Sequence, residues 1–243
     1  VPFALLLLCW HGRKQPGYRQ HIGERFGFIN VPRDRPIFWL HAVSVGETRA
    51  AEPLVHALLE QYPQHQILLT HMTPTGRETS TNLYRDPRVL IAYVPYDLAG
   101  AVDRFLQRVR PELGLLMETE IWPNLILRSR RHGIPVLLIN ARLSERSARR
   151  YARFASHIRP VLAALSATGA QTPADAERLA ALGAYPVEVT GNLKFDVKIN
   201  PAQQTLGETW RTGLPADRPV WLAASTREGE EPLILAAHHA LCA

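Results

Sequence analysis

The chain has 243 residues, of which 46% are hydrophobic and 21% charged, a balance ordinary for a folded protein of one large or two small domains. Its 28 lysines and arginines outnumber its 22 aspartates and glutamates, so the net charge of +6 favours an anionic partner. The two cysteines, Cys9 and Cys242, exclude a disulfide framework and a zinc-binding pair, and they indicate a reducing environment.

The first 35 residues combine an apolar start with a basic continuation. Residues 1–10, VPFALLLLCW, are too few to cross a bilayer, which takes about twenty residues. The following HGRKQPGYRQHIGERFGF is typical of the cytoplasmic flank of a membrane anchor. We interpret residues 1–35 as a truncated membrane anchor with a basic juxtamembrane segment; the alternative is a short helix packed on the body of the protein.

From residue 36 onward, short apolar runs alternate with longer amphipathic ones. Runs rich in Val, Ile and Leu without polar alternation predict strands buried on both faces of a parallel sheet, so the pattern predicts a doubly wound α/β domain. The expected strands are Ile37–Ala42, Gln66–Thr70, Val89–Val94, Leu113–Met117, Val136–Asn140, Ala164–Gln171 and Val187–Thr190. The expected helices are Glu47–Gln61, Gly76–Leu83, Leu98–Val109, Pro123–His132, Glu145–Leu162 and Pro173–Leu182.

The pattern changes after GNLKFD (191–196). We assign residues 36–198 to a complete N-terminal Rossmann-like domain and the polar residues 199–218, rich in proline and glycine, to an interdomain linker. Residues 219–243 restart the alternation with a strand, Val220–Ala224, and a helix from Glu230. They are interpreted as the beginning of a second, truncated domain.

Several familiar sites are missing from the sequence. It contains no G-x-G-x-x-G, no P-loop, no H-E-x-x-H and no G-x-S-x-G. Ligands of an open α/β sheet bind at the carboxyl ends of the strands. The residues that follow each apolar run are therefore the candidates.

Glu47 follows the first strand, in HAVSVGE, at the start of a helix. A carboxylate there can simply stabilise the helix, by about 0.3–1 kcal/mol. However, N-caps are usually Ser, Thr, Asp or Asn, so we expect the side chain of Glu47 to point outward into the crevice as a reagent, kept ionised by the helix N-terminus.

Glu118 and Glu120 follow the fourth strand. Two residues apart in an extended segment, they should share one side. One of them could merely cap the helix that begins at Pro123. Together with Glu47 they instead indicate a general base with neighbouring carboxylates that tune it. We interpret His41, Met72 and Met117, at the same edge, as packing residues.

Arginines gather in RSRRH (128–132) and NARLSERSARRYARFASHIR (140–159). A solvated basic face is the ordinary explanation; the functional one is a docking surface for phosphates or anionic lipid. Tyr151 and Phe154, within the second run, are expected to face the core.

Five segments occur in order and at suitable spacing: HAVSVGE, METEIWPN, INARLS, TGNLKFD and STREGEE. Together they resemble the 3-deoxy-D-manno-oct-2-ulosonic acid (Kdo) transferase family of lipopolysaccharide assembly, over essentially the whole chain. The resemblance implies a GT-B glycosyltransferase, in which two Rossmann-like domains face each other. It implies transfer of Kdo from CMP-Kdo to a lipid A precursor at the cytoplasmic side of the inner membrane, without a metal, another cofactor or a nucleic-acid partner.

The resemblance also implies roles for particular residues. Glu47 corresponds to the proposed general base, and an acid of ETE, which we place at Glu120, is also important. The N-terminal domain would bind the acceptor and the C-terminal domain the donor. The residues expected to contact substrate are Ser44, Gly46, Glu118, Arg128, Arg142, Arg146 and Lys194.

Two departures from the family pattern matter. Arg227 stands in Ser-Thr-Arg-Glu (225–228), where the family commonly has His. In addition, we expect the chain alone to be inactive, because its donor domain is truncated. The alternatives are a GT-B transferase that uses another sugar nucleotide, such as a UDP sugar, and a non-catalytic module that binds membrane surfaces.

Overall fold

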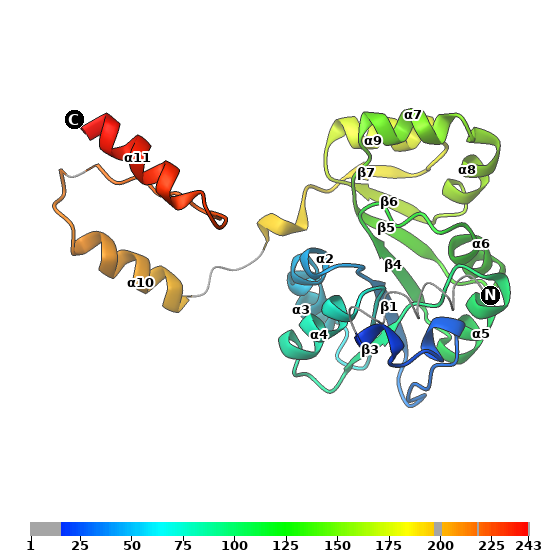
Figure 1. Ribbon diagram of the computed structural model, residues 1–243. Helices are drawn as coiled ribbons and strands as arrows, with labels where there is room; N and C mark the ends of the chain where they lie inside the picture. The colour runs from blue at the N-terminus through cyan, green and yellow to red at the C-terminus, as the bar shows by residue number, and fades with distance from the viewer. Residues whose placement is uncertain (1–15, 197–200, 218, 243) are drawn as a thin grey trace. The chain divides into compact units, whose positions relative to one another are not determined.

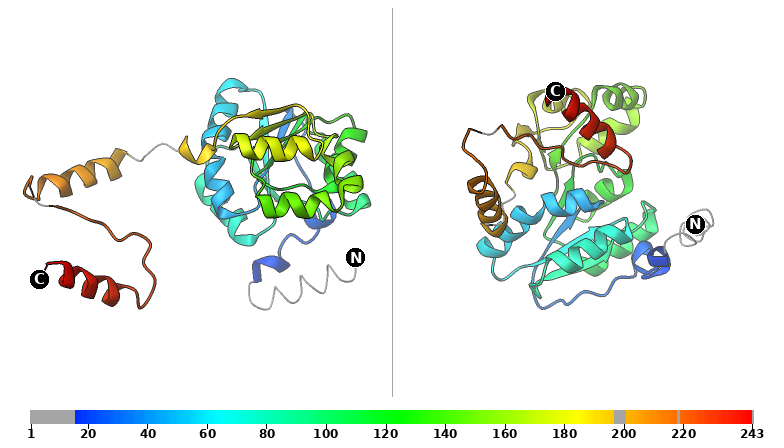
Figure 2. Two further views of the ribbon diagram at one scale, coloured as in Figure 1. Left: turned by 90° about the horizontal axis from the view of Figure 1, so that it is seen from above. Right: turned by 60° about the vertical axis from the view of Figure 1, so that its left-hand side comes forward.

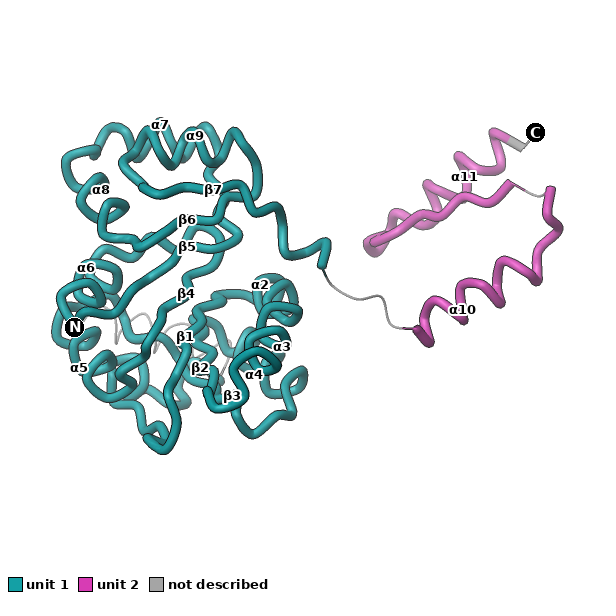
Figure 3. The backbone as a smooth tube through the Cα atoms, turned by 180° about the vertical axis from the view of Figure 1, so that it is seen from behind, with its two compact units in different colours: residues 1–197 teal, residues 198–243 magenta. Residues whose placement is uncertain are grey.

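The computed structural model describes residues 16–196, 201–217 and 219–242. The chain divides into two compact units, residues 1–197 (unit 1) and 198–243 (unit 2), which are coloured separately in Figure 3. The apolar residues 1–10, expected to be an anchor, lie outside the described residues. In the part of the chain that is described, no helix combines the length and the apolar character needed to span a bilayer.

Unit 1 is built on one parallel sheet of seven strands in the order β3-β2-β1-β4-β5-β6-β7 (Figure 1). The predicted α/β class and Rossmann-like domain are therefore confirmed. The strands are β1 (Ile37–His41), β2 (Gln66–His71), β3 (Val89–Tyr93), β4 (Leu113–Met117), β5 (Val136–Ala141), β6 (Ala167–Ala170) and β7 (Val187–Val189). The expected strand Ala164–Gln171 is shortened, because Ala164 and Leu165 belong to the turn that ends the preceding helix.

Helices lie on both faces of this sheet (Figures 1 and 2). They are α2 (Val45–Ala50), α3 (Glu52–Gln61), α4 (Pro74–Leu83), α5 (Ala99–Val109), α6 (Pro123–Arg131), α7 (Glu145–Ala152), α8 (Ala155–Leu162) and α9 (Pro173–Ala181). Short 3-10 turns complete the unit at η1 (Pro16–Arg19), η2 (Glu24–Phe26) and η3 (Leu193–Phe195).

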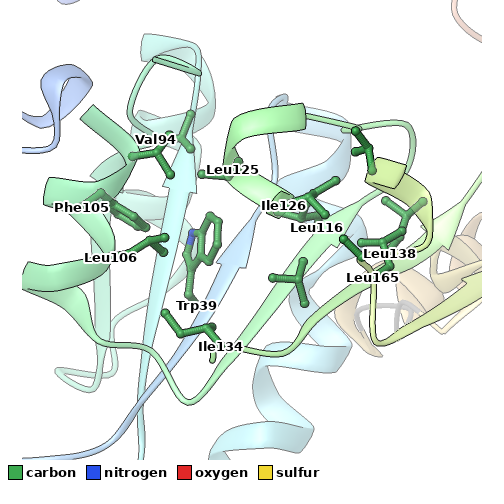
Figure 4. Close-up of a cluster of buried hydrophobic side chains, with 14 of the residues drawn as sticks. Trp39, Val94, Phe105, Leu106, Leu116, Leu125, Ile126, Ile134, Leu138 and Leu165 are labelled. Atoms are coloured by element: carbon green, nitrogen blue, oxygen red, sulfur yellow. The ribbon is translucent and has the colours of Figure 1, made fainter. Parts of the chain in front are cut away.

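Alternate residues of the central strands enter two different cores, because successive side chains of a strand point to opposite faces. Trp39 of β1 lies against Phe105 of α5, with ring centroids 5.2 Å apart, in a cluster that also receives Leu125 of α6 (Figure 4). Leu40, the next residue of β1, lies in the other cluster, with Val55 of α3.

Two expected helices are each divided. Residues 47–61 form α2 and α3, since Pro53 has no N–H to continue the first helix and suits the first turn of the second. Residues 145–162 form α7 and α8, because Phe154 leaves the helical region at φ −117° and ψ 32°. After this break, Val161 and Leu162 of α8 reach the core.

The segment that precedes β1 is docked on the sheet rather than free. The ζ carbon of Arg25 lies 3.8 Å from the ring centre of Tyr93, and its Nη1 donates to the carbonyl of Met72 at 3.1 Å. Glu24 pairs with Arg77 at 2.6 Å and accepts the backbone N–H of Tyr93 at 2.7 Å. Glu24 and Arg25, which belong to the expected juxtamembrane segment, thus pack against the folded domain.

Unit 2 differs from its expectation in two places. Helix α10 (Pro201–Thr212) occupies most of the expected linker. Helix α11 (Glu231–Cys242) fits the expected helix, but the described residues 219–230 contain no strand, so the expected strand Val220–Ala224 is wrong. A single strand is not stable without a neighbour to pair with.

Candidate active site

The sheet order reverses between β1 and β4: β1 is followed by β2 and β3 on one side, whereas β4 is followed by β5, β6 and β7 on the other. Ligands of open α/β sheets bind at such a reversal, outside the carboxyl ends of the strands. The segment 42–47 follows β1 and the segment 118–122 follows β4. Both carry glutamates, so the candidate site lies where these two segments meet.

Glu47 is folded back onto its own helix N-terminus. Its Oε2 accepts the backbone N–H of Val43 at 2.8 Å, and its Oε1 accepts the hydroxyl of Ser44 at 2.9 Å. Ser44 is the N-cap of α2 and accepts the backbone N–H of Glu47 at 3.4 Å. The expectation of an outward-pointing Glu47 is therefore wrong: its side chain turns back to the N-cap as in a capping box, although it takes the N–H of Val43 in place of that of Ser44, and Glu47 is 8% exposed.

The pKa of Glu47 is raised above its ordinary value of 4.5. Burial is the largest cause, and the negative charges of Glu118 and Glu120 add to it, while the hydrogen bonds from Val43 and Ser44 oppose it. The causes that raise the pKa therefore outweigh those that lower it. A carboxylate with a raised pKa is a stronger base, and this suits proton removal near neutral pH.

Glu118 and Glu120 lie in a turn instead of an extended segment. Glu118 has a φ of +56°, and the N–H of Glu120 donates to the carbonyl of Met117 at 3.3 Å. The indole N–H of Trp122 donates to the Glu120 carboxylate. Burial and the charge of Glu118 raise the pKa of Glu120, whereas the bond from Trp122 lowers it.

Neither of these acids caps α6, although the sequence allowed it. Asp97, in the loop after β3, does so: it accepts the backbone N–H of Leu125 at 2.8 Å and that of Asn124 at 3.0 Å. The sequence does not predict this cap, because Asp97 stands 27 positions before its partner Asn124. With the helix capped by Asp97, Glu118 and Glu120 have no capping role to explain them.

Lys194 reaches the same edge from η3. Its Nζ lies 3.4 Å from Oε1 of Glu118. The turn that carries it is fixed by Asn140, at the end of β5, whose Oδ1 accepts the N–H of Leu193 at 3.2 Å. Asn140 is 2% exposed and has a φ of +50°, a conformation that asparagine tolerates better than most residues. Asn140 lies in the INARLS segment, but no local pattern in the sequence marks it as the residue that holds this turn.

The three candidate arginines separate into two groups. Arg128 pairs with Asp103 of α5, which also accepts from His132 at 3.2 Å. It is therefore already paired within the fold, and its expected contact with a phosphate stays a prediction. Arg142 and Arg146 are exposed, and their side chains make no hydrogen bond or ion pair with any described residue.

The packing residues and aromatics are mostly as expected. His41 and Met117 are fully buried, and Met72 packs against the core, which confirms their interpretation. Burial lowers the pKa of His41 to about 3; its Nδ1 lies 2.9 Å from the carbonyl of Thr70 and must donate to it. Tyr151 packs on the core as expected, but Phe154 is 60% exposed. Within residues 16–196, 201–217 and 219–242, no group of three or more His, Cys, Asp or Glu is placed to hold a metal ion.

Solved structures that resemble part of this chain include UDP-N-acetylglucosamine 2-epimerases. One has a TM-score of 0.49 and 17% identity, over 72% of this chain and 55% of that one. The enzyme of Neisseria meningitidis bound to UDP-GlcNAc has a TM-score of 0.48 and 15% identity, over 73% of this chain and 51% of its own.

Sequence relatives are much more similar. The 3-deoxy-D-manno-octulosonic acid transferase of Haemophilus influenzae is 42% identical over 98% of this chain and 57% of its own length. That of Bordetella pertussis is 44% identical over 97% of this chain and 56% of its own length. The probable mitochondrial enzyme of Arabidopsis thaliana is 32% identical over 99% of this chain and 55% of its own length. The chain thus spans somewhat more than half the length of these relatives.

Residues 20–197 also match the family described as 3-Deoxy-D-manno-octulosonic-acid transferase (kdotransferase). The match covers nearly all of unit 1, including each of the carboxylates at the reversal of the sheet and Lys194. The chain belongs to the Kdo transferase family.

Proposed function

We propose that this chain is the acceptor-binding part of a glycosyltransferase of lipopolysaccharide synthesis, which transfers Kdo from CMP-Kdo to a lipid A precursor. Membership of the Kdo transferase family supports the proposal that Kdo is the sugar transferred. The proposed place is the cytoplasmic face of the inner membrane, where a phosphorylated, acylated acceptor would be met. In a GT-B arrangement, a second domain would hold the donor, and Arg227 would lie where the family commonly has histidine.

The observation that carries the mechanism is Glu47, buried beside Glu118 and Glu120 with its pKa raised. A sugar hydroxyl is a poor nucleophile at neutral pH, and a positioned base relieves this. The hydroxyl oxygen of the acceptor bonds to the anomeric carbon of Kdo as the bond from that carbon to the phosphate oxygen of CMP breaks. The hydroxyl proton passes to the carboxylate of Glu47, and CMP departs with the bonding electrons.

Glu47 can perform this step without leaving its helix. Each carboxylate oxygen has two lone pairs, and the structure assigns one hydrogen bond to each oxygen. The remaining lone pairs are available to an acceptor hydroxyl. Glu118, and to a smaller extent Glu120, assist by raising the pKa of Glu47 through their charges.

Substrate contacts are proposed at the edge around this base. Ser44 orients Glu47, and Gly46 is exposed at the first turn of α2. Lys194, 52% exposed at its side chain, can exchange Glu118 for an anionic group of a substrate. Arg142 and Arg146 are free to meet acceptor phosphates, a role for which Arg128 is less suited because Asp103 binds it.

The test compares Glu47→Gln with Glu52→Gln in a chimera that supplies the rest of the Haemophilus influenzae relative after this chain. CMP release from CMP-Kdo is measured with a lipid A precursor. We expect Glu47→Gln to lower kcat by at least about 100-fold, the usual contribution of a general base, and Glu52→Gln, on the neighbouring helix α3, to leave it unchanged.

Other outcomes separate the alternatives. Unchanged turnover in Glu47→Gln would reduce this residue to a helix cap. Turnover of a UDP sugar in place of CMP-Kdo would identify a transferase with another donor. A chimera that binds acceptor vesicles but turns over neither donor would support the non-catalytic alternative.

A further inference from the structure

A row of four arginines crosses one face of α7. Arg146, Arg149, Arg150 and Arg153, here called the arginine stripe, follow the spacing i, i+3, i+4 and i+7, which places them on one side of a helix. All four are exposed, and with Glu145 they line a surface cavity of about 410 Å³. The helix that carries them lies on the outside of unit 1 (Figure 1).

The direction of the stripe is fixed by packing on the other side of the helix. Ala148 and Tyr151 of α7 lie against the core cluster of the sheet. No residue of α7 is fully buried. The helix is therefore attached by one narrow face and presents its arginines to the solvent.

The charges of the stripe are poorly compensated. Glu145 is the only acid in α7, and it pairs with Arg149 at 2.5 Å. The side chains of Arg146, Arg150 and Arg153 make no hydrogen bond or ion pair with a described residue. Like charges four residues apart on a helix repel each other, and the stripe contains two such pairs, 146/150 and 149/153. An anionic surface would relieve this repulsion.

An aromatic side chain lies at the end of the stripe. Phe154 follows Arg153 directly and is 60% exposed, whereas the neighbouring Tyr151 packs inward. Arginines with an exposed phenylalanine beside them are typical of segments that rest at a bilayer interface, where the ring enters the headgroup boundary and the cations meet anionic lipids. A nucleic acid could also use the arginines and stack a base on Phe154, so the choice of a bilayer depends on the proposed lipid acceptor and is tested below.

We infer that the arginine stripe and Phe154 form a docking surface for an anionic lipid bilayer. The row from Arg146 to Arg153 is about 10 Å long, at 1.5 Å per residue, so several anionic headgroups can be met at once. This inference deepens the proposed function, on which it depends for the choice of a membrane as the partner, and it names the surface by which the protein would rest there. Binding to vesicles needs neither donor nor acceptor, so the two proposals can fail separately.

The experiment measures co-sedimentation of the whole chain with vesicles of phosphatidylcholine, with and without about one third phosphatidylglycerol. The variant Arg146→Gln/Arg150→Gln/Arg153→Gln leaves the pair of Arg149 and Glu145 intact. Its matched control, Arg33→Gln/Arg35→Gln/Arg85→Gln, removes the same charge from exposed positions elsewhere in unit 1. Each basic residue near an anionic surface contributes about fivefold in affinity. We therefore expect the α7 variant to bind anionic vesicles about 100-fold more weakly and the control to stay within about threefold of the original chain.

Phe154→Ser provides a second variant. It should weaken binding to anionic vesicles while the net charge stays the same. An equal loss in both triple variants would overturn the inference, because net charge alone would then explain binding. Unchanged binding of the α7 variant would overturn it too, since another segment would hold the vesicles. The chain could also bind single-stranded RNA more tightly than vesicles. If the α7 variant lost that binding, the partner of the stripe would be a nucleic acid and the inference of a bilayer would be overturned.

Discussion

Ser44 and Glu47 hydrogen-bond each other in both directions. The hydroxyl of Ser44 donates to Oε1 of Glu47 at 2.9 Å and accepts the backbone N–H of Glu47 at 3.4 Å. The same serine therefore starts the helix and orients the proposed base. Because the carboxylate also binds the N–H of Val43, its position is set by the backbone on both sides of the cap.

Replacing Ser44 with alanine should have two separable effects. The free energy of unfolding should fall by about 1 kcal/mol, the usual loss for an N-cap. The pKa of Glu47 should rise further, since the bond from Ser44 lowers it, and the lower limb of the pH–rate profile of the chimera should move to higher pH. Ser144→Ala, at the N-cap of α7, is the control: it should lose similar stability and leave the pH profile in place. A pH profile that moves in both variants would contradict the link between Ser44 and Glu47.

Glu120 should make stability depend on pH. Its folded pKa is raised, so the stability that it contributes is complete below the ordinary value of about 4.5 and is lost as the pH rises through the folded value. Glu120→Gln keeps an acceptor for the indole of Trp122 but cannot ionise. In urea unfolding, the variant should therefore gain stability relative to the original chain as the pH is raised from about 4.5.

Trp122→Phe tests the same pair from the other side. It removes the N–H that lowers the pKa of Glu120, so the decline of stability should extend to higher pH than in the original chain. A difference between Glu120→Gln and the original chain that stays constant with pH would contradict the raised pKa.

The buried histidines should make the fold sensitive to acid. Burial lowers the pKa of His41 to about 3 and that of His71 to about 4, both from 6.5. Unfolding lets both bind protons below about pH 6.5, so each should reduce the free energy of unfolding by up to about 1.4 kcal/mol per pH unit, until the folded pKa is reached. His71→Gln should flatten this slope, while His157→Gln at an exposed position should not. If the free energy of unfolding fell equally steeply with decreasing pH in the original chain and in both variants, the lowered pKa of His71 would be contradicted.

Gly46 offers a test of close approach by a substrate. It occupies the second position of α2, and an added Cβ would meet only Ser44 Oγ, at 3.9 Å. Gly46→Ala should therefore raise the free energy of unfolding by about 0.5–1 kcal/mol. If a substrate lies against this turn, kcat/KM of the chimera should fall at the same time. Gly100→Ala, at the second position of α5, where a Cβ meets nothing within 4 Å, is the matched control. Unchanged kcat/KM in Gly46→Ala would remove Gly46 from the site.

Lys194 should matter more for binding than for folding. Its pair with Glu118 is partly exposed, and such pairs contribute between zero and about 1 kcal/mol. Lys194→Met should raise KM for one of the two substrates, with urea unfolding nearly unchanged, and Lys194→Arg should recover part of the loss. If Lys194→Met lowered the free energy of unfolding and left KM unchanged, Lys194 would only stabilise the position of η3.

The sheet could be predicted because its signal is local. The uninterrupted apolar runs of β1, β2 and β4 can be buried only between two layers of helices, and their alternation with helices selects parallel strands. The same patterns located the edge that carries Glu47 and Glu118. The signal missed at Glu47 was also local, since Ser44-x-x-Glu47 is a capping box in the sequence itself.

Other features depend on pairs that are distant in the chain. Arg128 pairs with Asp103, which lies 25 positions earlier in the chain. Lys194 pairs with Glu118, which lies 76 positions earlier. No periodicity predicts such meetings, because they depend on how the helices cross the sheet. The exposure of Phe154 belongs with these, since it follows from a break between α7 and α8 that the amphipathic pattern conceals.

The loop after β3 is fastened twice: the N–H of Tyr96 donates to the carbonyl of Arg25 at 2.8 Å, and Asp97 holds the first turn of α6. This loop is consequently a poor place for an inserted tag, a fluorophore or a new chain terminus, although it runs over the surface between two elements. The glycine turns at Gly133 and Gly183, with φ of +72° and +108°, connect elements at the opposite edge of the sheet. Probes attached to exposed residues beside these glycines, such as Arg131, would report on the protein while leaving the carboxylates undisturbed.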